Sequence, residues 1–454
     1  MLNRHVPDAP VAPPSRRDTS SAARTVPPRS SPYRFATLRN GLGVVLRPMP
    51  HAESVSLGVW VRVGGRYETA DVSGVSHFVE HLLFKGTRTR TCEQLKQAIE
   101  GVGGSLNGFT AEEFTCYMAK VPARHLRRAT AVLSDMVLHP SMRPVDVEKE
   151  REVILEEIRM YEDAPAQYVH DLFNQLLWPN HPLGSLLSGT SGTVKRLTRA
   201  QIVDHWRRCY RPSASLVSCA GALDADPLIR RLEQAFGRRQ GRGRMRSFRR
   251  APRPQRGPQI RLVQKTTEQA HICLGTPAMP RTSPHRFALE LLHVVLGANM
   301  SSRLFREVRE KRGLVYEIGT HIKRYKDAGA FVIYAGCDTG KLSTTVKTVL
   351  DQLARVKRER VGPSELRRAK DFYGGQLLMG LEDTMDHMLW IGEQAITVNR
   401  VAEPRQVIEC LERVTPAEIQ TVARALFTPQ RLYLAAIGPV STHQRDVTRQ
   451  LSEA

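Results

Sequence analysis

Two copies of one helix-to-strand pattern stand 217 residues apart in this chain of 454 residues. In the first copy, Thr198-Arg-Ala-Gln201 has the form of a capping box that starts a helix, and an apolar strand ending at Gly221 follows. In the second copy, Thr415-Pro-Ala-Glu418 starts the same order of elements, which ends at Gly438. An offset so close to half the chain predicts a duplicated domain.

Composition predicts where the two copies begin and end. Residues 1–32 are rich in Pro, Ser, Ala and Arg and show no periodicity, so we expect a disordered basic tail. Residues 238–258 contain nine arginines and no acid, which is typical of an extended, solvated linker. The predicted domains are therefore residues 33–237 and residues 259–446.

The formal charge of +22 at pH 7 and the isoelectric point near 10.1 make the chain unusually basic. Such a charge often accompanies nucleic-acid binding. Much of the excess, however, lies in the tail and in the stretch between the copies, and no nucleic-acid motif with interleaved aromatic residues accompanies it. Nucleic-acid binding is therefore not expected, and a basic surface for acidic partners or substrates is the milder interpretation.

Seven cysteines are scattered singly, without a C-x-x-C pair. An odd and dispersed set argues against a disulfide framework and against a cysteine zinc site, and it favours a reducing compartment. No run approaches the ~18 apolar residues that a membrane-spanning helix needs. We therefore expect no membrane association.

The stretch Ser73–Lys85 carries the most specific chemical signal. His77, Glu80 and His81 read H-x-x-E-H, a spacing that places three polar groups on one face of a helix. Their neighbours are apolar, so the helix should be buried on nearly every side. An unpaired buried polar group costs roughly 1–3 kcal/mol, and a metal ion would satisfy these groups. A lone helical histidine is usually only hydrogen-bonded, however, and a catalytic zinc needs a third protein ligand.

A second helix with acidic residues follows at residues 145–160. Glu150 and Glu157 stand two helical turns apart and share a face. Most such acids are solvated surface charges. Periodicity alone cannot choose the glutamate that faces the core, because the same helix also carries Glu148, Glu152 and Glu156.

Strand signals surround the H-x-x-E-H helix. Asn40-Gly41 predicts a hairpin, and apolar residues alternate with others over residues 55–63, as in a half-buried strand. Residues 105–110 and 114–121 resemble two strands of a further hairpin. The first of these carries Asn107-Gly108 in its middle, where glycine marks either the close approach of another backbone or a bulge.

The second copy keeps the layout without the metal motif. Residues 271–274 are strand-like, and residues 287–296 form an apolar helix in the place of the H-x-x-E-H helix, with His293 alone. A helix and two paired strands then follow, ending near residue 336. One half can hold a metal ion and the other cannot.

Four segments, HFVEHLLFKGT, GGSLNGFT, EREVILEEI and REKRGLVY, resemble in order and spacing the pitrilysin/insulinase family of inverted-motif zinc peptidases. The resemblance runs from about Tyr33 to Val440 and is greatest to the mitochondrial processing peptidase subunits and their bacterial relatives. It implies two homologous α+β domains, each an antiparallel sheet with helices packed mainly on one face. Together they would form half of a clamshell.

The resemblance also implies the roles of the polar residues. In the family, a glutamate ligand follows the second histidine by about 76 residues, which implies Glu157 here, with the neighbouring Glu156 as the alternative. His77, His81 and Glu157 would then hold Zn²⁺, and Glu80 would act as the general base. Glu150, seven residues before the ligand, would be the acid that orients or tunes the site.

Substrate contacts follow from the same resemblance. Asn107 and Gly108 would meet the substrate backbone by strand addition, although the family usually has alanine at the glycine position, so this edge should be somewhat looser. Arg309 and Tyr316 of the second half would reach the scissile carbonyl, with Arg312 as the rival arginine.

The sequence therefore predicts a zinc endopeptidase that hydrolyses extended or unfolded peptides. The alternative is a non-catalytic scaffold or substrate-binding subunit of a processing-peptidase-like complex. With two domains, the chain would need a second copy or a paralogous partner to enclose a chamber, so we expect a dimer. The motif style favours the cytoplasm of a bacterium, and the basic tail keeps the mitochondrial matrix as the alternative.

Overall fold

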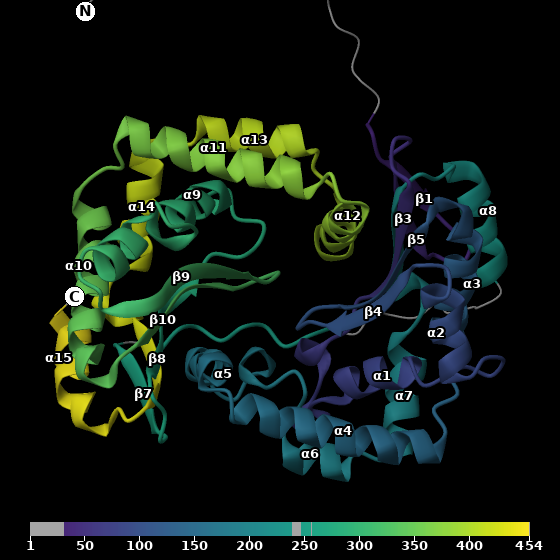
Figure 1. Cartoon of the computed structure of the whole chain (residues 1–454), viewed down its shortest axis with the longest axis horizontal. Coiled ribbons are helices and arrows are strands. Elements are labelled where there is room, and N and C mark those ends of the chain that lie inside the picture. The colour runs from purple at the N-terminus through teal and green to yellow at the C-terminus, as the bar shows by residue number, and fades with distance from the viewer. Residues whose placement is uncertain (1–30, 238–246, 256, 454) are drawn as a thin grey trace, which may run out of the picture. The chain divides into compact units, whose positions relative to one another are not determined.

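The computed structural model describes residues 31–237, 247–255 and 257–453. The predicted tail lies outside these ranges except for its last two residues, and so does part of the predicted linker. From residue 33 onward the chain forms one compact unit (Figure 1). No helix within the described ranges is long and apolar enough to cross a membrane.

The first half is built on a six-stranded sheet (Figure 1). Its strands, in spatial order, are β1 (Arg34–Thr37), β2 (Gly43–Pro48), β6 (Ser215–Gly221), β3 (Ser54–Val61), β5 (Thr115–Pro122) and β4 (Ser105–Thr110). All neighbours are antiparallel except β2 and β6. The predicted hairpins at Asn40-Gly41 and at residues 111–114 are confirmed.

The second half repeats this arrangement with five strands. Their spatial order is β7 (Gln259–Gln264), β11 (Tyr433–Gly438), β8 (Ala270–Ala278), β10 (Gly329–Cys337) and β9 (Val315–Arg324). The pair β7 and β11 is parallel and the others are antiparallel, as in the first sheet from β2 to β4. The predicted α+β fold with two similar halves is confirmed, with one unpredicted parallel pair in each sheet. The domain boundaries remain a prediction.

Helices pack on each sheet around a separate apolar core. The first half contains α1 (Val75–Leu83), α2 (Cys92–Glu100), α3 (Leu126–Leu138), α4 (Pro144–Glu162), α5 (Pro165–Leu177), α6 (Ser191–Arg196), α7 (Arg199–Cys209) and α8 (Ala225–Phe236). The second contains α9 (Arg286–Gly297), α10 (Leu342–Arg358), α11 (Pro363–Gly380), α12 (Thr384–Val398), α13 (Pro404–Arg413), α14 (Pro416–Leu426) and α15 (Gln444–Glu453). Both predicted capping boxes are present, at the starts of α7 and α14.

One helix from each half packs against the sheet of the other half. Helix α12 packs against β2, β3 and β6, and α5 packs against β7, β8 and β11 (Figure 1). The prediction that residues 55–63 form a half-buried strand is therefore wrong, because β3 is buried on both faces. Trp60, on the face predicted to be exposed, lies against Gly392 of α12, where any side chain would collide with its ring.

The described part of the predicted linker, residues 247–255, contains no helix or strand and is mostly exposed, but it contacts both halves. The ring of Phe248 lies 3.9 Å from the guanidinium of Arg66, a residue with 1% of its surface exposed. Arg66 also pairs with Glu113 at 2.6 Å and with Asp327 of the second half. The backbone N–H of Ala251 donates to Asp327 as well. This stretch is anchored because it completes a buried ionic junction between the halves.

Candidate metal centre

The position of α1 is fixed at its N-terminus by a buried carboxylate. Gly74 precedes the helix with a φ of 92°, a conformation that glycine adopts without strain, and it has no side chain that could cap the helix. Glu68 takes this role. Its two carboxylate oxygens accept hydrogen bonds from the backbone N–H groups of Gly74 and Ser76, each at 2.7 Å. A negative charge at this end also complements the helix dipole.

His77, His81 and Glu157 bring three ligand atoms together between α1 and α4. Glu157 Oε2 lies 3.9 Å from His77 Nε2 and 3.5 Å from His81 Nε2. Tetrahedral zinc with bonds of roughly 2.0–2.2 Å separates its ligand atoms by about 3.3–3.6 Å, so the group needs little adjustment to hold the ion. Within the described residues, it is the one group of three or more His, Cys, Asp or Glu side chains with this proximity.

The two histidines differ in their surroundings. Burial, and then the neighbouring His81, lowers the pKa of His77 to about 3, so its imidazole is neutral and able to coordinate a metal. Its Nδ1 is buried and has no partner in the described structure. Burial alone would lower the pKa of His81, but the hydrogen bond to Glu150 and the charge of Glu157 outweigh it and raise that pKa. A cation among these residues would suit both imidazoles.

Glu150 contacts the ligand residue His81 without belonging to the ligand group itself. It is 4% exposed, and its Oε2 lies 3.2 Å from His81 Nδ1 while its Oε1 pairs with Lys85 Nζ at 2.6 Å. Burial opposes its charge, but the bonds to His81 and Lys85 prevail and lower the pKa of the carboxyl. An ionised Glu150 fixes the ring of His81 with Nε2 toward Glu157. The rival Glu156 instead pairs with Arg159 at the surface.

Glu80 shares the helix face of the histidines but is held separately. Thr110, the last residue of β4, donates its hydroxyl to Glu80 Oε2 at 3.1 Å. Burial raises the pKa of Glu80, against the opposing effects of His81 and Thr110. A carboxyl with a raised pKa, close to a metal site but outside the ligand group, has the properties of a general base.

Strand β4 lies at the edge of the first sheet, and among the described residues it pairs with β5 alone. Asn107 is exposed, and its side-chain oxygen accepts from the backbone N–H of Gly108. The register with β5 is unbroken, so Gly108 does not mark a bulge. A Cβ at this position would lie 3.0 Å from the ring of Phe84, so packing explains the glycine. The expectation of a looser edge finds no support here.

Arg309 and Tyr316 contact each other. Arg309 lies in a π-helix, η6 (Phe305–Glu310), and its guanidinium is 5.4 Å from the ring of Tyr316, which is 77% exposed. No hydrogen bond, ion pair or ring contact within the described ranges joins either side chain to the histidines or to Glu157. The structure thus brings the predicted ligands, Glu80 and Glu150 together, and within the described residues none of these contacts joins Arg309 or Tyr316 to them.

Comparisons with known proteins agree with this geometry. A family model described as insulinase (peptidase family M16) matches residues 43–191, and one described as the peptidase M16 inactive domain matches residues 196–373. An uncharacterized zinc protease of Mycobacterium tuberculosis is 38% identical over 441 residues, which are 96% of this chain and 98% of the relative. The chain belongs to peptidase family M16. An uncharacterized zinc protease of Bacillus subtilis is 35% identical over 403 residues, covering 89% of this M16 chain and 97% of its own.

Solved structures share the M16 fold. A protease from Helicobacter pylori superposes with a TM-score of 0.85 at 21% identity and covers 90% of this chain and 99% of its own. A peptidase M16 inactive domain from Pseudomonas fluorescens has a TM-score of 0.83 at 16% identity, with 90% and 98% covered. At these identities the likeness concerns the fold alone.

Three supporting residues of this M16 chain were not predicted from sequence. Glu68 caps the N-terminus of α1, Thr110 donates to Glu80 of α1, and Lys85 pairs with Glu150 of α4. Lys85 stands four residues after His81, a spacing that could have suggested it. Glu68 and Thr110 contact α1 from outside that helix, and the periodicity of the sequence gives no signal for such contacts.

Proposed function

We propose that this M16 chain is a zinc-dependent endopeptidase that hydrolyses peptide bonds in extended or unfolded segments. The observation that carries the proposal is the convergence of His77, His81 and Glu157, with the carboxylate of Glu80 beside them on α1. A scaffold or substrate-binding subunit would have no need for such a group. The complete set therefore favours catalysis over the non-catalytic alternative.

The three ligands would hold the ion, and Glu150 with Lys85 would keep His81 oriented. Bound zinc supplies Lewis acidity, which polarises a carbonyl and lowers the pKa of water toward about 7. Glu80 would accept the proton of the attacking water at its carboxylate and later donate it to the amine nitrogen that leaves. Burial raises the pKa of Glu80, which makes its carboxylate a stronger base than that of an ordinary glutamate.

Substrate binding would use the unpaired edge of β4. An extended peptide added there would gain main-chain hydrogen bonds from the strand that carries Asn107 and Gly108. The same strand ends at Thr110, which contacts Glu80. This continuity would align the scissile bond with the base. Arg309 and Tyr316 are proposed to bind the carbonyl from the second half, after the halves or a partner close around the peptide.

The test is metal analysis with peptide cleavage for the native chain and for Glu80→Gln. The native chain should contain about one zinc ion and cleave an unfolded peptide. The variant should keep its zinc and lose cleavage. Equal cleavage by both would refute the mechanism, and a zinc-containing but inactive native chain would favour the non-catalytic alternative.

We also propose that the active form is a homodimer or a complex with a paralogous subunit, in the bacterial cytoplasm. Two domains alone expose the β4 edge, whereas a second pair would enclose the peptide. Light scattering combined with the cleavage assay tests the assembly. A monodisperse monomer with full activity would contradict it.

A further inference from the structure

A cavity of about 480 Å³ lies in the second half, between η6, α10 and the start of α11. The positively charged groups on its wall are Arg303, Arg306, Lys311, Arg355 and Arg368. Glu307 and Glu365 are the two acids among the lining residues, so the wall carries an excess of three positive charges. A cavity with this balance attracts anions.

Some of this charge is compensated locally, and the rest is available. Arg303 binds Glu365 with two bonds of 2.8 Å and 2.6 Å, Lys311 pairs with Glu307 at 2.6 Å, and Arg355 pairs with Glu359 at 2.7 Å. Arg306 takes part in no side-chain bond or ion pair within the described ranges, and Arg368 donates to a neutral hydroxyl, that of Ser364. These two exposed guanidinium groups can therefore meet a ligand without breaking an ion pair.

The start of α11 adds backbone donors to the same wall. The helix has 18 residues, and its N-cap residue, Gly362, provides no side-chain cap. Gly362, Pro363 and Ser364 all line the cavity, and a Cβ at Gly362 would meet nothing within 4 Å. Pro363 has no N–H, so the backbone donors at this end are those of Ser364 and Glu365, and such donors, together with the helix dipole, bind phosphate oxygens well.

A buried amide on the wall lacks a partner. Gln352 of α10 lines the cavity with 7% of its surface exposed, and its Oε1 has no hydrogen-bond partner in the described structure. The Nη1 of Arg303 is also buried without a partner. Buried polar groups are normally paired, so two such atoms at one cavity point to a missing ligand. A half-turn of the amide would present its NH₂ group to an anion.

We propose that this cavity binds a small molecule with two or more phosphoryl groups. Paired guanidinium groups, a helix N-terminus and an amide donor together suit phosphate oxygens, and the volume exceeds what a single phosphate would fill. The site lies on the segment that carries Arg309, since Arg306 and Arg309 belong to the same π-helix. It requires neither the zinc ligands nor the proposed peptidase activity.

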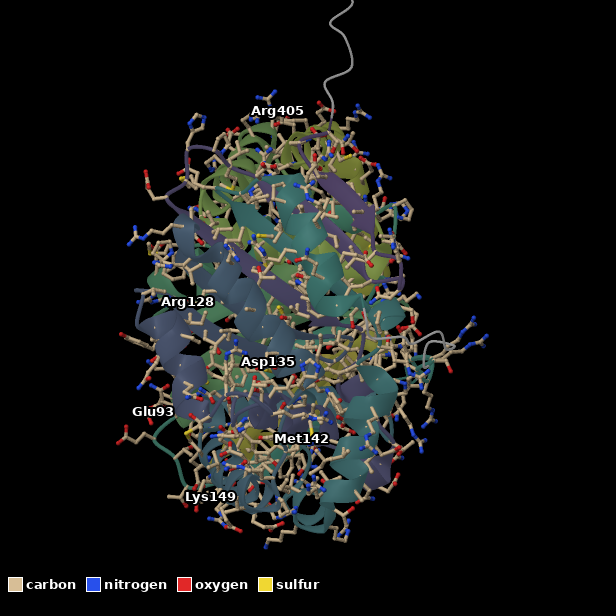
Figure 2. All side chains as sticks on the ribbon, turned by 90° about the vertical axis from the view of Figure 1, so that its right-hand side faces the viewer. Glu93, Arg128, Asp135, Met142, Lys149 and Arg405 are labelled. Carbon is tan, nitrogen blue, oxygen red and sulfur yellow. The ribbon has the colours of Figure 1, made fainter. Side chains whose placement is uncertain are left out.

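Isothermal titration calorimetry with inorganic pyrophosphate at about 150 mM salt tests the site, because this ionic strength screens weak surface attraction. One pyrophosphate should bind per chain. The double variant Arg306→Gln/Arg368→Gln and the variant Gln352→Leu should each weaken binding at least tenfold. Arg405→Gln, at an exposed arginine remote in sequence (Figure 2), is the matched control and should leave binding unchanged.

Three outcomes with intact zinc ligands would overturn the proposal. These are the absence of binding, equal weakening by Arg405→Gln, which would show general attraction to a basic protein, and tighter binding of an acidic peptide than of pyrophosphate. Because pyrophosphate chelates zinc, the titration is repeated with the zinc-ligand variant His77→Ala, in which binding should persist. Loss of binding there would assign the heat to the metal centre. Cleavage is not measured, so the result is independent of the proposed peptidase function.

Discussion

Replacing Glu68 by alanine should destabilise the protein through the first turn of α1. The carboxylate is 6% exposed and accepts the N–H groups of Gly74 and Ser76 at 2.7 Å each. Without it, two buried donors lose a charged acceptor, and each loss costs about 1–3 kcal/mol. Water entering the vacated space would recover part of this. The free energy of unfolding should therefore fall by about 3 kcal/mol.

Urea denaturation measures this loss of stability. The variant Glu68→Gln separates the contribution of one hydrogen bond from that of the other. Glutamine keeps the shape of the side chain and one acceptor oxygen, but it points an NH₂ group at the second N–H. About half of the destabilisation should therefore remain. Because α1 also carries His77 and His81, a frayed first turn should weaken zinc binding, which competition with a chelator can follow.

The control is Glu93→Gln in the first turn of α2. Glu93 projects from the surface (Figure 2) and is exposed, and substitutions at such positions usually change stability by less than about 0.5 kcal/mol. If Glu68→Ala changed the free energy of unfolding as little as this control, the carboxylate would not be the cap of α1, and the reasoning would fail.

Two further predictions concern the surroundings of the centre, and a third concerns a partly buried histidine on β9 of the second half. Thr110→Val removes the donor that holds Glu80, so kcat should fall about tenfold with KM and zinc content unchanged, and Thr110→Ser should restore kcat in steady-state kinetics. Lys85→Met leaves Glu150 without its cation and should weaken zinc binding about 10- to 100-fold in a chelator competition, with peptide KM unchanged. Burial, and to a smaller extent neighbouring basic groups, lowers the pKa of His321 to about 3, so the unfolded state binds more protons below about pH 6.5. The contribution of His321 to the free energy of unfolding should therefore be complete above pH 6.5 and decline as the pH falls. Between pH 7 and pH 5, urea denaturation should show that His321→Gln loses roughly 1–2 kcal/mol less of its free energy of unfolding than the native chain does.

Local signals predicted the elements that carry the candidate site. The alternation of residues, the capping boxes and the turn at Asn40-Gly41 each depend on interactions within a few positions, and the structure contains the elements they indicate. The offset of 217 residues likewise indicated two similar halves, and the two sheets share their order. Sequence periodicity could not choose Glu157, because several glutamates of α4 had equal claims until its contacts with the histidines were known.

Contacts between distant elements were not predictable in this way. Trp60 alternates with apolar residues as an exposed residue would, yet α12 of the other half covers it. The helix that covers β3 lies more than 300 residues further along the chain, and no local pattern announces it. Gly108 is a similar case, since a Cβ there would lie 3.0 Å from the ring of Phe84 and 3.2 Å from the backbone oxygen of Cys116 on β5. The parallel pair in each sheet also depends on strands that are distant in sequence.

The two halves show why buried polar groups on α1 indicate a metal ion. Helix α9 stands in the equivalent place and also carries a glutamate and a histidine on buried turns. There Glu290 pairs with Arg324, and His293 Nδ1 lies 2.7 Å from the hydroxyl of Thr320. The strand β9 thus satisfies both groups without an ion. Within the described residues, strand β4 satisfies Glu80 of α1 through Thr110, while His77 Nδ1 stays unpartnered and three ligand atoms face one another. The same physical requirement thus has two solutions in one chain, and in the first half the proposed cation would meet it.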